Sequence, residues 1–394
     1  MKKFLFIPLF IICLTTTAQI NFVKFNSLNE LFKEAKKQQK YIFIDGYTNW
    51  CGWCKELDKV VFSNKVFADT IHKYFIPIKL EMEKDSLGVI IARKYAVIGF
   101  PQAIILDNEG RLIKILNGYS PLERYFMRMQ EALADCKQNK FIAGYSTNFS
   151  QNYPEFYIKQ FPMPGIKKEK RDSTTINLYL TKQKNWANET VWNVIRANYY
   201  LLNSTNQNLL RKKLPELAIL FGKAETEELY ISAASKQINQ LQKVADETEF
   251  ITTIDSLTNS LDEKWWYMFQ YKKDYYEEHK DYKKLALTID EYLNNKKEKS
   301  NVSIINETAW NLYLHCNDTG VLTKAITWMH DFVLLNDPLY MYIDTYAALL
   351  YKTGKLNEAK AQAILAIKVG KADNENTEET EKLLDKIKLQ LQSK

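Results

Sequence analysis

Residues 50–55 read Trp-Cys-Gly-Trp-Cys-Lys, and this stretch decides the fold of the N-terminal part of the chain. It follows residues 41–45, Tyr-Ile-Phe-Ile-Asp, an apolar run rich in aromatic and β-branched residues that predicts a buried strand. Residues 56–65 contain neither proline nor glycine and carry apolar side chains at positions 57, 60 and 61, which predicts the beginning of a helix. The predicted order is therefore strand, tight turn, Cys-x-x-Cys and helix.

The position of the two cysteines in this order predicts redox chemistry. Thiols at the start of a helix lie near unpaired backbone N–H groups and the positive end of the helix dipole, which favour the thiolate. Such cysteines have pKa values lowered from about 8.5 to roughly 3.5–7.5. Because residues three apart share one face of a helix, Cys54 can reach Cys51 and close a disulfide. We expect one nucleophile and one resolving thiol that work without a bound cofactor.

Two alternatives compete with a redox-active disulfide, namely a metal site and a purely structural disulfide. A Cys-x-x-Cys supplies two ligands, whereas a structural zinc site usually needs four. The sequence has no second Cys-x-x-Cys and no His-x3–5-His pair, because the four histidines are scattered at positions 72, 279, 315 and 330. Cys136 and Cys316 stand alone. Redox chemistry is the favoured interpretation, and no metal is expected.

The first 18 residues have the pattern of a secretory signal peptide. A basic start and a short apolar run precede small residues at Thr16 and Ala18. We expect cleavage after Ala18. Cys13 would be lost with the peptide, because the bulky Ile12 before it argues against a lipoprotein anchor. No later segment is long and apolar enough to predict a membrane span, so the mature protein is expected to be soluble, exported and periplasmic.

Length and composition indicate an ordinary globular protein of two or three domains. The chain has 394 residues and a formal net charge of +7, of which Lys2 and Lys3 belong to the predicted signal peptide. Lysines and acids are interspersed, and the many aromatic residues recur at helical spacing, which favours a core over base stacking. Nucleic-acid binding is not expected. Four cysteines in a mature chain of this size do not form a disulfide scaffold.

The first domain is predicted to alternate strands and helices and to end in a hairpin. Ser27 and Glu30 form a capping-box pattern at the start of a helix. Strands separated by helices predict parallel pairing, whereas the short Asn-Glu-Gly turn at 108–110 predicts an antiparallel hairpin. The expected strands are 20–25 (an edge strand), 41–46, 75–82, 102–107 and 111–116, and further helices are expected at 87–95 and from 121.

This order of elements and its motifs resemble the thioredoxin superfamily over about residues 20–137. The resemblance rests on Trp50 directly before Cys51, on a buried acid six residues before that cysteine, on a strand lysine facing the acid, and on a Gly-Phe-Pro turn before a strand. The residues that carry it are Asp45, Trp50, Cys51, Cys54, Lys79, Gly99, Phe100, Pro101 and Gly118. The run 61–75 is especially similar to the exported branch akin to the C-terminal domain of the transmembrane thiol reductant conductors. The resemblance implies a central mixed sheet flanked by helices.

The resemblance also implies roles for the residues around the disulfide. Cys51, nearer the helix start and usually exposed in this fold, would attack the substrate disulfide, and Cys54 would resolve the mixed disulfide. Asp45, desolvated behind the pair, would have a raised pKa and accept the proton of Cys54. Lys79 would moderate that shift. The alternative for Lys79 is an ordinary strand lysine with its head group in solvent.

The proline loop and the aromatic residues complete the predicted site. A cis bond before Pro101 would hold Phe100 extended beside the sulfurs, whereas the alternative is a trans proline that starts a strand. Trp50, Trp53, Tyr47 and Phe100 would form an apolar docking rim for unfolded segments, or would merely cover the redox pair. Trp53 stands where the family commonly has proline. Since the residues between the cysteines tune the redox potential, the direction of catalysis stays open.

Beyond the first domain, the composition and the hydrophobic pattern of the sequence change twice. Residues 138–172 are rich in proline and glycine and are interpreted as a linker, with partial packing on the first domain left open. Residues 173–394 lack strand signals and predict an all-α domain, with helices around 174–183, 187–203, 205–221, 224–241, 246–260, 263–279 and 281–294. Gly320 and Gly354 are 34 residues apart, as are Ala325 and Ala359, so residues 303–371 resemble tetratricopeptide repeats.

These observations predict an exported thiol–disulfide oxidoreductase with a helical-repeat domain for partner binding. Its partners would be protein substrates with disulfides or cysteines, and a membrane or periplasmic thiol redox partner. The alternative is a non-catalytic, chaperone-like binding scaffold in which the thioredoxin fold is structural. Cys316 is expected to be a buried structural thiol, and for Cys136 a free core thiol is favoured over a third redox partner.

Overall fold

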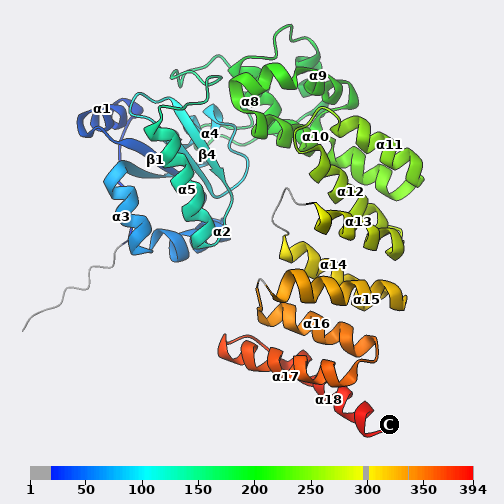
Figure 1. Cartoon of the computed structure of the whole chain (residues 1–394). Helices are drawn as coiled ribbons and strands as arrows, with labels where there is room; N and C mark the ends of the chain where they lie inside the picture. The colour runs from blue at the N-terminus through cyan, green and yellow to red at the C-terminus, as the bar shows by residue number, and fades with distance from the viewer. Residues whose placement is uncertain (1–18, 296–300, 336, 394) are drawn as a thin grey trace, which may run out of the picture. The chain divides into compact units, whose positions relative to one another are not determined.

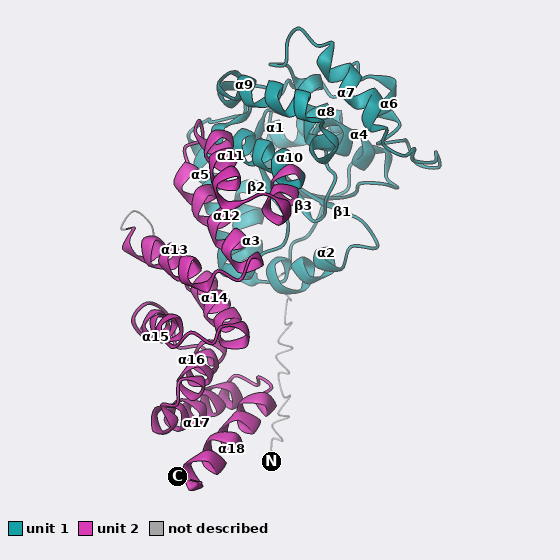
Figure 2. Ribbon diagram, turned by 90° about the vertical axis from the view of Figure 1, so that its right-hand side faces the viewer, with its two compact units in different colours: residues 1–236 teal, residues 237–394 magenta. Residues whose placement is uncertain are grey.

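The computed structural model describes residues 19–295, 301–335 and 337–393. The chain forms two compact units, one that reaches to Lys236 and one from Gln237 onward, and the division falls within helix α10 (Lys223–Val244) (Figure 2). The predicted signal peptide lies outside the described residues. Among the residues that are described, no helix combines the length and the apolar character needed to cross a membrane.

The first unit is built on a four-stranded mixed sheet (Figure 1). Its strands are β1 (Tyr41–Tyr47), β2 (Phe75–Glu81), β3 (Gln102–Leu106) and β4 (Leu112–Asn117), in the order β2-β1-β3-β4. β1 and β2 are parallel, whereas β3 is antiparallel to both β1 and β4. The predicted parallel half and C-terminal hairpin are both present. Gly110 has φ +87° in the hairpin turn, a conformation that glycine adopts without steric cost.

The predicted edge strand at 20–25 is wrong, because this segment has no strand structure. The segment lies beside β2 and donates one backbone hydrogen bond to it, from Val23 N to the carbonyl oxygen of Pro77 at 2.8 Å. In a strand, the N–H and C=O of one residue point to the same side, so Pro77 has no N–H to return on this edge. The hydrogen-bond ladder of β2 is therefore not continued by residues 20–25.

Helices cover both faces of the sheet. α1 (Leu28–Gln38) begins with the predicted cap, in which the N–H of Glu30 donates to Ser27 Oγ at 3.2 Å. α2 (Gly52–Leu57) continues into a π-helical segment (Asp58–Phe62), and α3 (Lys65–Tyr74), α4 (Ser86–Lys94) and α5 (Leu122–Lys137) follow. One core cluster joins the π-helical segment, α3 and α5 to the sheet through fully buried aromatic side chains, including Phe43, Phe62, Phe67 and Tyr125. This cluster fixes the helix that begins at the cysteines.

The segment predicted as a linker, 138–172, contains one short helix, α6 (Glu155–Ile158), and packs on the sheet domain. The N–H of Ile142 donates to the carbonyl oxygen of Leu112 on β4 at 2.7 Å. The hydroxyl of the buried Tyr157 donates to the carbonyl oxygen of Arg93 on α4, also at 2.7 Å. The compact unit thus continues past the predicted end of the first domain, and the boundaries at 137 and 172 stay predictions.

Helices α7 (Ser173–Thr181), α8 (Glu189–Asn198) and α9 (Ser204–Phe221) complete the first unit together with the N-terminal half of α10. They bind the end of α4 through buried polar groups. Lys94, which is fully buried, pairs with Glu189, and Asn193 Nδ2 donates to the carbonyl oxygen of Lys94 at 2.8 Å. Arg196 Nη1 donates to the carbonyl oxygen of Tyr95 at 2.7 Å. These contacts hold the loop that leads to Phe100 and Pro101.

The second unit contains only helices and connecting turns in its described residues. After the C-terminal part of α10 it comprises α11 (Glu247–Thr258), α12 (Lys264–Glu278), α13 (Tyr282–Asn294), α14 (Val302–His315), α15 (Thr319–Trp328), a π-helical segment (Met329–Leu334), α16 (Tyr340–Lys352), α17 (Leu356–Ala372) and α18 (Glu378–Gln392). The predicted all-α region is confirmed. Gly354, with φ +79°, lies in the turn between α16 and α17, and Ala325 and Ala359 are fully buried. The tetratricopeptide-like repeats stay a prediction.

Candidate functional site

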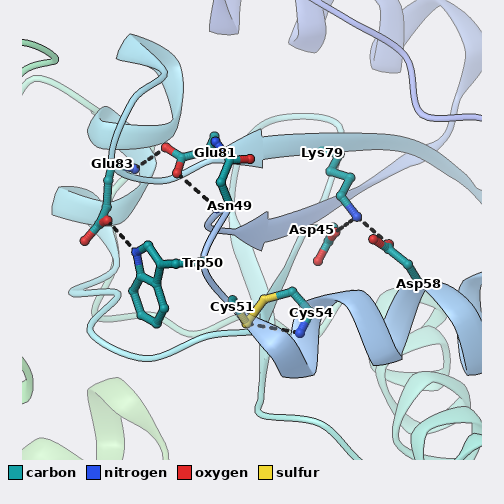
Figure 3. Close-up of a disulfide and its surroundings, with 9 residues drawn as sticks. All are labelled: Asp45, Asn49, Trp50, Cys51, Cys54, Asp58, Lys79, Glu81 and Glu83. Carbon is teal, nitrogen blue, oxygen red and sulfur yellow. Dashed lines mark hydrogen bonds and ion pairs between the residues drawn. A yellow bond between two sulfur atoms is a disulfide. The ribbon is translucent and has the colours of Figure 1, made fainter.

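Cys51 and Cys54 form a disulfide at the N-terminus of α2 (Figure 3). β1 ends at Tyr47, and the N–H of Cys51 donates to the carbonyl oxygen of Thr48 at 3.1 Å, which closes the tight turn before the helix. Cys51 is the N-cap residue, and the backbone N–H of Cys54 donates to its Sγ at 3.0 Å. The Cys51 sulfur therefore occupies the position where the N–H groups and the dipole of the helix favour negative charge.

Exposure does not distinguish the two cysteines in this oxidised form. Each has an exposed fraction of 4%. The expectation that Cys51 is the exposed member of the pair is therefore not met while the disulfide is closed. Only the position relative to the helix separates them, because Cys51 caps α2 whereas Cys54 lies within its first turn.

Asp45 is a buried acid behind the disulfide, on the face of the sheet that carries α2 (Figure 3). It lies on β1 and pairs in register with Lys79 on β2, so the two side chains point to the same face of the sheet. Lys79 Nζ is 3.0 Å from Asp45 Oδ2. Burial raises the pKa of Asp45 to about 6, although the positive charge of Lys79 opposes the shift. Asp45 can therefore exchange a proton near neutral pH.

Lys79 lies between two carboxylates, and its side chain is only 21% exposed. Its ammonium group pairs with Asp45 and also with Asp58 on the π-helical segment (Figure 3). Burial alone would lower the pKa of Lys79, but the two carboxylates raise it above its usual range. Sequence reasoning missed Asp58. Its position, four residues after Cys54, is one helical turn further on the same face and could have indicated it.

The proline loop has the geometry that the resemblance implied. The Phe100–Pro101 peptide bond is cis, and the N–H of Gly118, directly after β4, donates to the carbonyl oxygen of Pro101 at 2.9 Å. The ring of Phe100 contacts the ring of Trp50 edge to face, with 5.7 Å between the centroids. The cis-proline loop thus contacts, through Phe100, the residue that directly precedes Cys51.

The predicted aromatic rim is only partly assembled. Trp50 and Trp53 are 67% and 62% exposed. Trp53 stacks on Tyr119, with ring centroids 5.1 Å apart, a partner that the sequence did not suggest. The ring of Tyr47 instead faces the ammonium group of Lys79 at 5.0 Å. The exposed aromatic surface beside the disulfide is therefore made by Trp50, Trp53 and the half-buried Phe100.

Two acidic residues that sequence reasoning also missed hold Trp50 in place (Figure 3). The indole Nε1 of Trp50 donates to Glu83 Oε2 at 2.9 Å. The backbone N–H of Glu83 in turn donates to Oε2 of the buried Glu81, also at 2.9 Å. Glu81 ends β2, beside the end of β1 from which the cysteine turn departs. The Trp50 side chain is therefore exposed to solvent, and its hydrogen bond to Glu83 fixes the orientation of its ring.

The other two cysteines in the described part of the chain are free and buried. Cys136 belongs to the core of the sheet domain, where burial raises the pKa of its thiol to about 12. Burial also raises the pKa of Cys316, which lies at the C-terminal end of α14. Neither thiol is activated. No group of three or more metal-ligating side chains is assembled within residues 19–295, 301–335 and 337–393.

Comparison with known protein families agrees with this geometry. The family profile described as a thioredoxin-like domain matches residues 28–133. The thiol:disulfide interchange protein DsbD of Vibrio vulnificus strain CMCP6 is 27% identical over 100 residues, which are 24% of this chain and 17% of that protein. DsbD of Escherichia coli strain K12 is 27% identical over 101 residues, with the same coverage of 24% and 17%. The similarity thus spans less than a fifth of these two relatives.

Solved structures are similar over the same part of the chain. A solution structure of a candidate disulphide-isomerase from Bacteroides thetaiotaomicron is 31% identical, covering 30% of this chain and 95% of that one with a TM-score of 0.28. The oxidised C-terminal domain of Neisseria meningitidis DsbD is 17% identical, covering 28% and 97% with a TM-score of 0.24. From the family profile and the disulfide geometry, we conclude that residues 28–133 are a thioredoxin-like domain with a Cys51–Cys54 pair, followed by a helical region.

Proposed function

We propose that this protein is a thiol–disulfide oxidoreductase that acts on protein disulfides through Cys51 and Cys54. The observation that carries the proposal is the placement of the Cys51 sulfur at the N-terminus of α2, with the buried Asp45 behind the pair. The names of the DsbD relatives support the same chemistry. The reaction needs no cofactor beyond the disulfide itself. The proposed setting is the periplasm, with a membrane or periplasmic dithiol as redox partner.

The reduction of a substrate by the dithiol form proceeds in two exchanges. The Cys51 thiolate attacks one sulfur of the substrate disulfide, forms a mixed disulfide and releases the first substrate thiolate, which takes up a proton. The Cys54 thiolate then attacks the Cys51 sulfur, closes the disulfide seen here and releases the second substrate thiol. A partner dithiol reverses these steps. Two electrons pass to the substrate in each cycle, and the reverse sequence oxidises a dithiol substrate.

Asp45 is the proposed acceptor of the Cys54 proton during the second exchange. Its pKa of about 6 places it within reach of a thiol near neutral pH, whereas an ordinary aspartate is too weak a base. Lys79, which lowers the pKa of Asp45, keeps part of the carboxyl population ionised and ready to accept that proton. Asp45 and Lys79 therefore set the pH range of resolution, and the helix N-terminus activates the first attack.

Reduction of insulin disulfides by the full chain, with a small dithiol as reductant, tests the proposal. Wild-type protein should turn over, and Cys51→Ser should abolish turnover. Cys54→Ser should accumulate a mixed disulfide with the substrate, because the resolving thiol is missing. Cys136→Ser is the matched control, since that thiol is buried in the core and its pKa is raised. Equal turnover by wild type and Cys51→Ser would reject the proposal in favour of a non-catalytic scaffold.

A further inference from the structure

A hollow of about 410 Å³ lies beside Trp50, the residue directly before Cys51. It is lined by Phe100 of the cis-proline loop and by the segment that connects α6 to α7, all within the first compact unit. Trp50 and Ile166 of that segment are 67% and 65% exposed, so apolar groups of the lining face solvent. An exposed apolar surface rimmed by polar groups is typical of an interaction site. The surface beside the reactive pair can therefore receive another polypeptide.

The rim of this hollow carries more positive than negative charge. Three cationic side chains line it, Lys84 from the turn after β2 and Lys168 and Arg171 from the segment between α6 and α7. Glu83 is the one carboxylate among the described residues that line it. Lys168 and Arg171 belong to the run Lys-Lys-Glu-Lys-Arg at 167–171, whose three lysines are all exposed. A ligand with negative charge therefore suits this hollow.

The carboxylates next to the hollow are engaged elsewhere. The side chain of Glu81 accepts two backbone N–H groups of the turn after β2. Asp85 and Asp172 cap the N-termini of α4 and α7. Glu169 pairs with a lysine outside the lining, Lys159, at 3.2 Å. In the described part of the chain, none of these four carboxylates forms an ion pair with a cation of the hollow.

The three cations are correspondingly short of anionic partners. Lys84 has no side-chain hydrogen bond or ion pair within the residues that the structure describes. Arg171 donates to the hydroxyl of Tyr200 and lies 5.6 Å from the centroid of its ring, so its partner is a phenol rather than an anion. Lys168 Nζ is 3.7 Å from Glu83 Oε1, while the other oxygen of Glu83 accepts an indole N–H (Figure 3). The hollow can therefore accept further carboxylates.

We propose that this hollow binds an acidic segment of the substrate polypeptide, close to the cysteine that reacts with Cys51. Apolar groups of the segment pack on Trp50 and Phe100, and its carboxylates pair with Lys84 and Lys168. Complementary charge speeds the encounter of two chains and suppresses wrong partners, so this surface selects substrates before the thiol exchange. The segment after the thioredoxin-like domain thereby contributes to specificity. This inference rests on the proposed function and specifies its substrate class.

The test compares two disulfide-linked peptides that are identical except for a pair of aspartates or a pair of lysines near the cysteine. With the full chain and a small dithiol as reductant, kcat/KM should be higher for the aspartate peptide, and added salt should weaken this preference. Lys84→Gln should lower the preference about threefold, the size expected for the loss of one exposed ion pair. Lys84→Glu combined with Lys168→Glu should invert it, because the lining then carries more negative than positive charge. The ratio between the peptides is the readout, since a change in the reactivity of Cys51 affects both equally.

Lys33→Glu combined with Lys36→Glu is the matched control. Both lysines are exposed on α1, and neither lines the hollow. Because α1 leads into the start of β1, whereas the disulfide follows the end of that strand, the control lies at the other end of the sheet. It changes the net charge by the same amount and should keep the wild-type preference. Thermal melts establish that both double variants are folded.

The outcomes separate this inference from the proposed function. If wild-type protein reduces both peptides equally well, or if the Lys84→Glu, Lys168→Glu variant keeps the preference for aspartate, the inference is overturned and the oxidoreductase proposal stands. A control that loses the preference to the same extent would assign it to net charge and would also overturn the inference. So would binding of wild-type protein, but not of the Lys84→Glu, Lys168→Glu variant, to phosphatidylglycerol vesicles without any peptide preference, because the cations would then serve a membrane surface. If wild-type protein exchanges with neither peptide, the proposed function fails and the inference falls with it.

Discussion

The first compact unit buries two lysine–carboxylate pairs, and they differ in how completely they are satisfied. At the end of α4, Lys94 is fully buried and pairs with Glu189, whose other oxygen accepts hydrogen bonds from the backbone and hydroxyl of Ser146. Beside the disulfide, Asp45 is equally buried, but among the described residues its oxygens have no partner besides the ion pair with Lys79. The first pair is saturated, and the second is not.

This difference bears on which of the two pairs can exchange a proton. A buried pair whose lone pairs and protons are all used stabilises one arrangement and has little reason to change its protonation. A buried carboxylate with few partners is driven toward its neutral form, and desolvation raises the pKa of Asp45 to about 6 although Lys79 opposes the shift. Desolvation that the ion pair with Lys79 offsets only in part is thus the physical origin of the proton exchange proposed for Asp45.

The largest effect is expected at the saturated pair. Lys94→Met should destabilise the first unit by about 3–5 kcal/mol, because it leaves Glu189 buried without its cation. Urea unfolding of the full chain measures this loss. Lys65→Met, which removes an exposed partner of Asp69, is the control and should cost under about 1 kcal/mol. A loss at Lys94 no larger than that of the control would show that the pair is not structural.

The second effect has the opposite sign. Asp45→Asn should stabilise the oxidised protein by about 3 kcal/mol at pH 7, since a folded pKa of about 6 against 3.8 means that ionising Asp45 opposes folding. The folded state binds the proton more tightly, so the gain is full above pH 6 and disappears as the pH falls below 3.8. Thermal melts across this range measure it.

The same Asp45→Asn variant should also slow resolution by Cys54 while the first attack by Cys51 stays nearly intact. Trapping of the mixed disulfide separates the two steps. A variant that is destabilised at pH 7 and resolves normally would make Asp45 an ordinary hydrogen-bonding residue.

A third, smaller effect is expected from the cation of the unsaturated pair. Lys79→Met removes the charge that lowers the pKa of Asp45, so the pH dependence of the resolution step should move up by about one unit or more. The rate of mixed-disulfide resolution against pH measures the shift. A profile that stays in place would show that Asp45 does not govern this step.

The smallest effect should come from Asp58, whose side chain is 37% exposed. Its charge raises the pKa of Asp45, so Asp58→Asn should move the same profile to lower pH by less than Lys79→Met moves it up. Stability should change by less than about 1 kcal/mol, as for other exposed ion-pair partners. Shifts of equal sign in the two variants would contradict the electrostatic account of this cluster.

Sequence alone predicted what depends on local chemistry. The strand before the cysteines, the helix they cap and their mutual reach follow from residue type and spacing within a few positions. The partners of these residues were harder to predict, because they come from distant elements. Glu83 binds Trp50 across 33 positions, and α8 and α10 reach the cis-proline loop from about a hundred residues away.

The wrong strand prediction at 20–25 and the packing of the segment 138–172 show the same physical limit of local composition. Residues 20–25 have strand propensity. They do not join the sheet as a strand, because Pro77 on β2 has no N–H with which to return the hydrogen bond from Val23. The segment 138–172 has the proline and glycine content of a linker, yet Tyr145, Tyr153 and Tyr157 are buried in the first unit. In both cases the deciding partner is remote in sequence, so local composition could not reveal it.

The two edge strands of the sheet, β2 and β4, also bear on edge-to-edge aggregation with other chains. Each open edge of a sheet presents unpaired backbone groups that can recruit a foreign strand and start aggregation. On β2, Pro77 offers no donor, and its carbonyl oxygen is already taken by Val23. On β4, the carbonyl oxygen of Leu112 is taken by Ile142. Each edge of the sheet therefore offers an incoming strand fewer backbone groups to pair with.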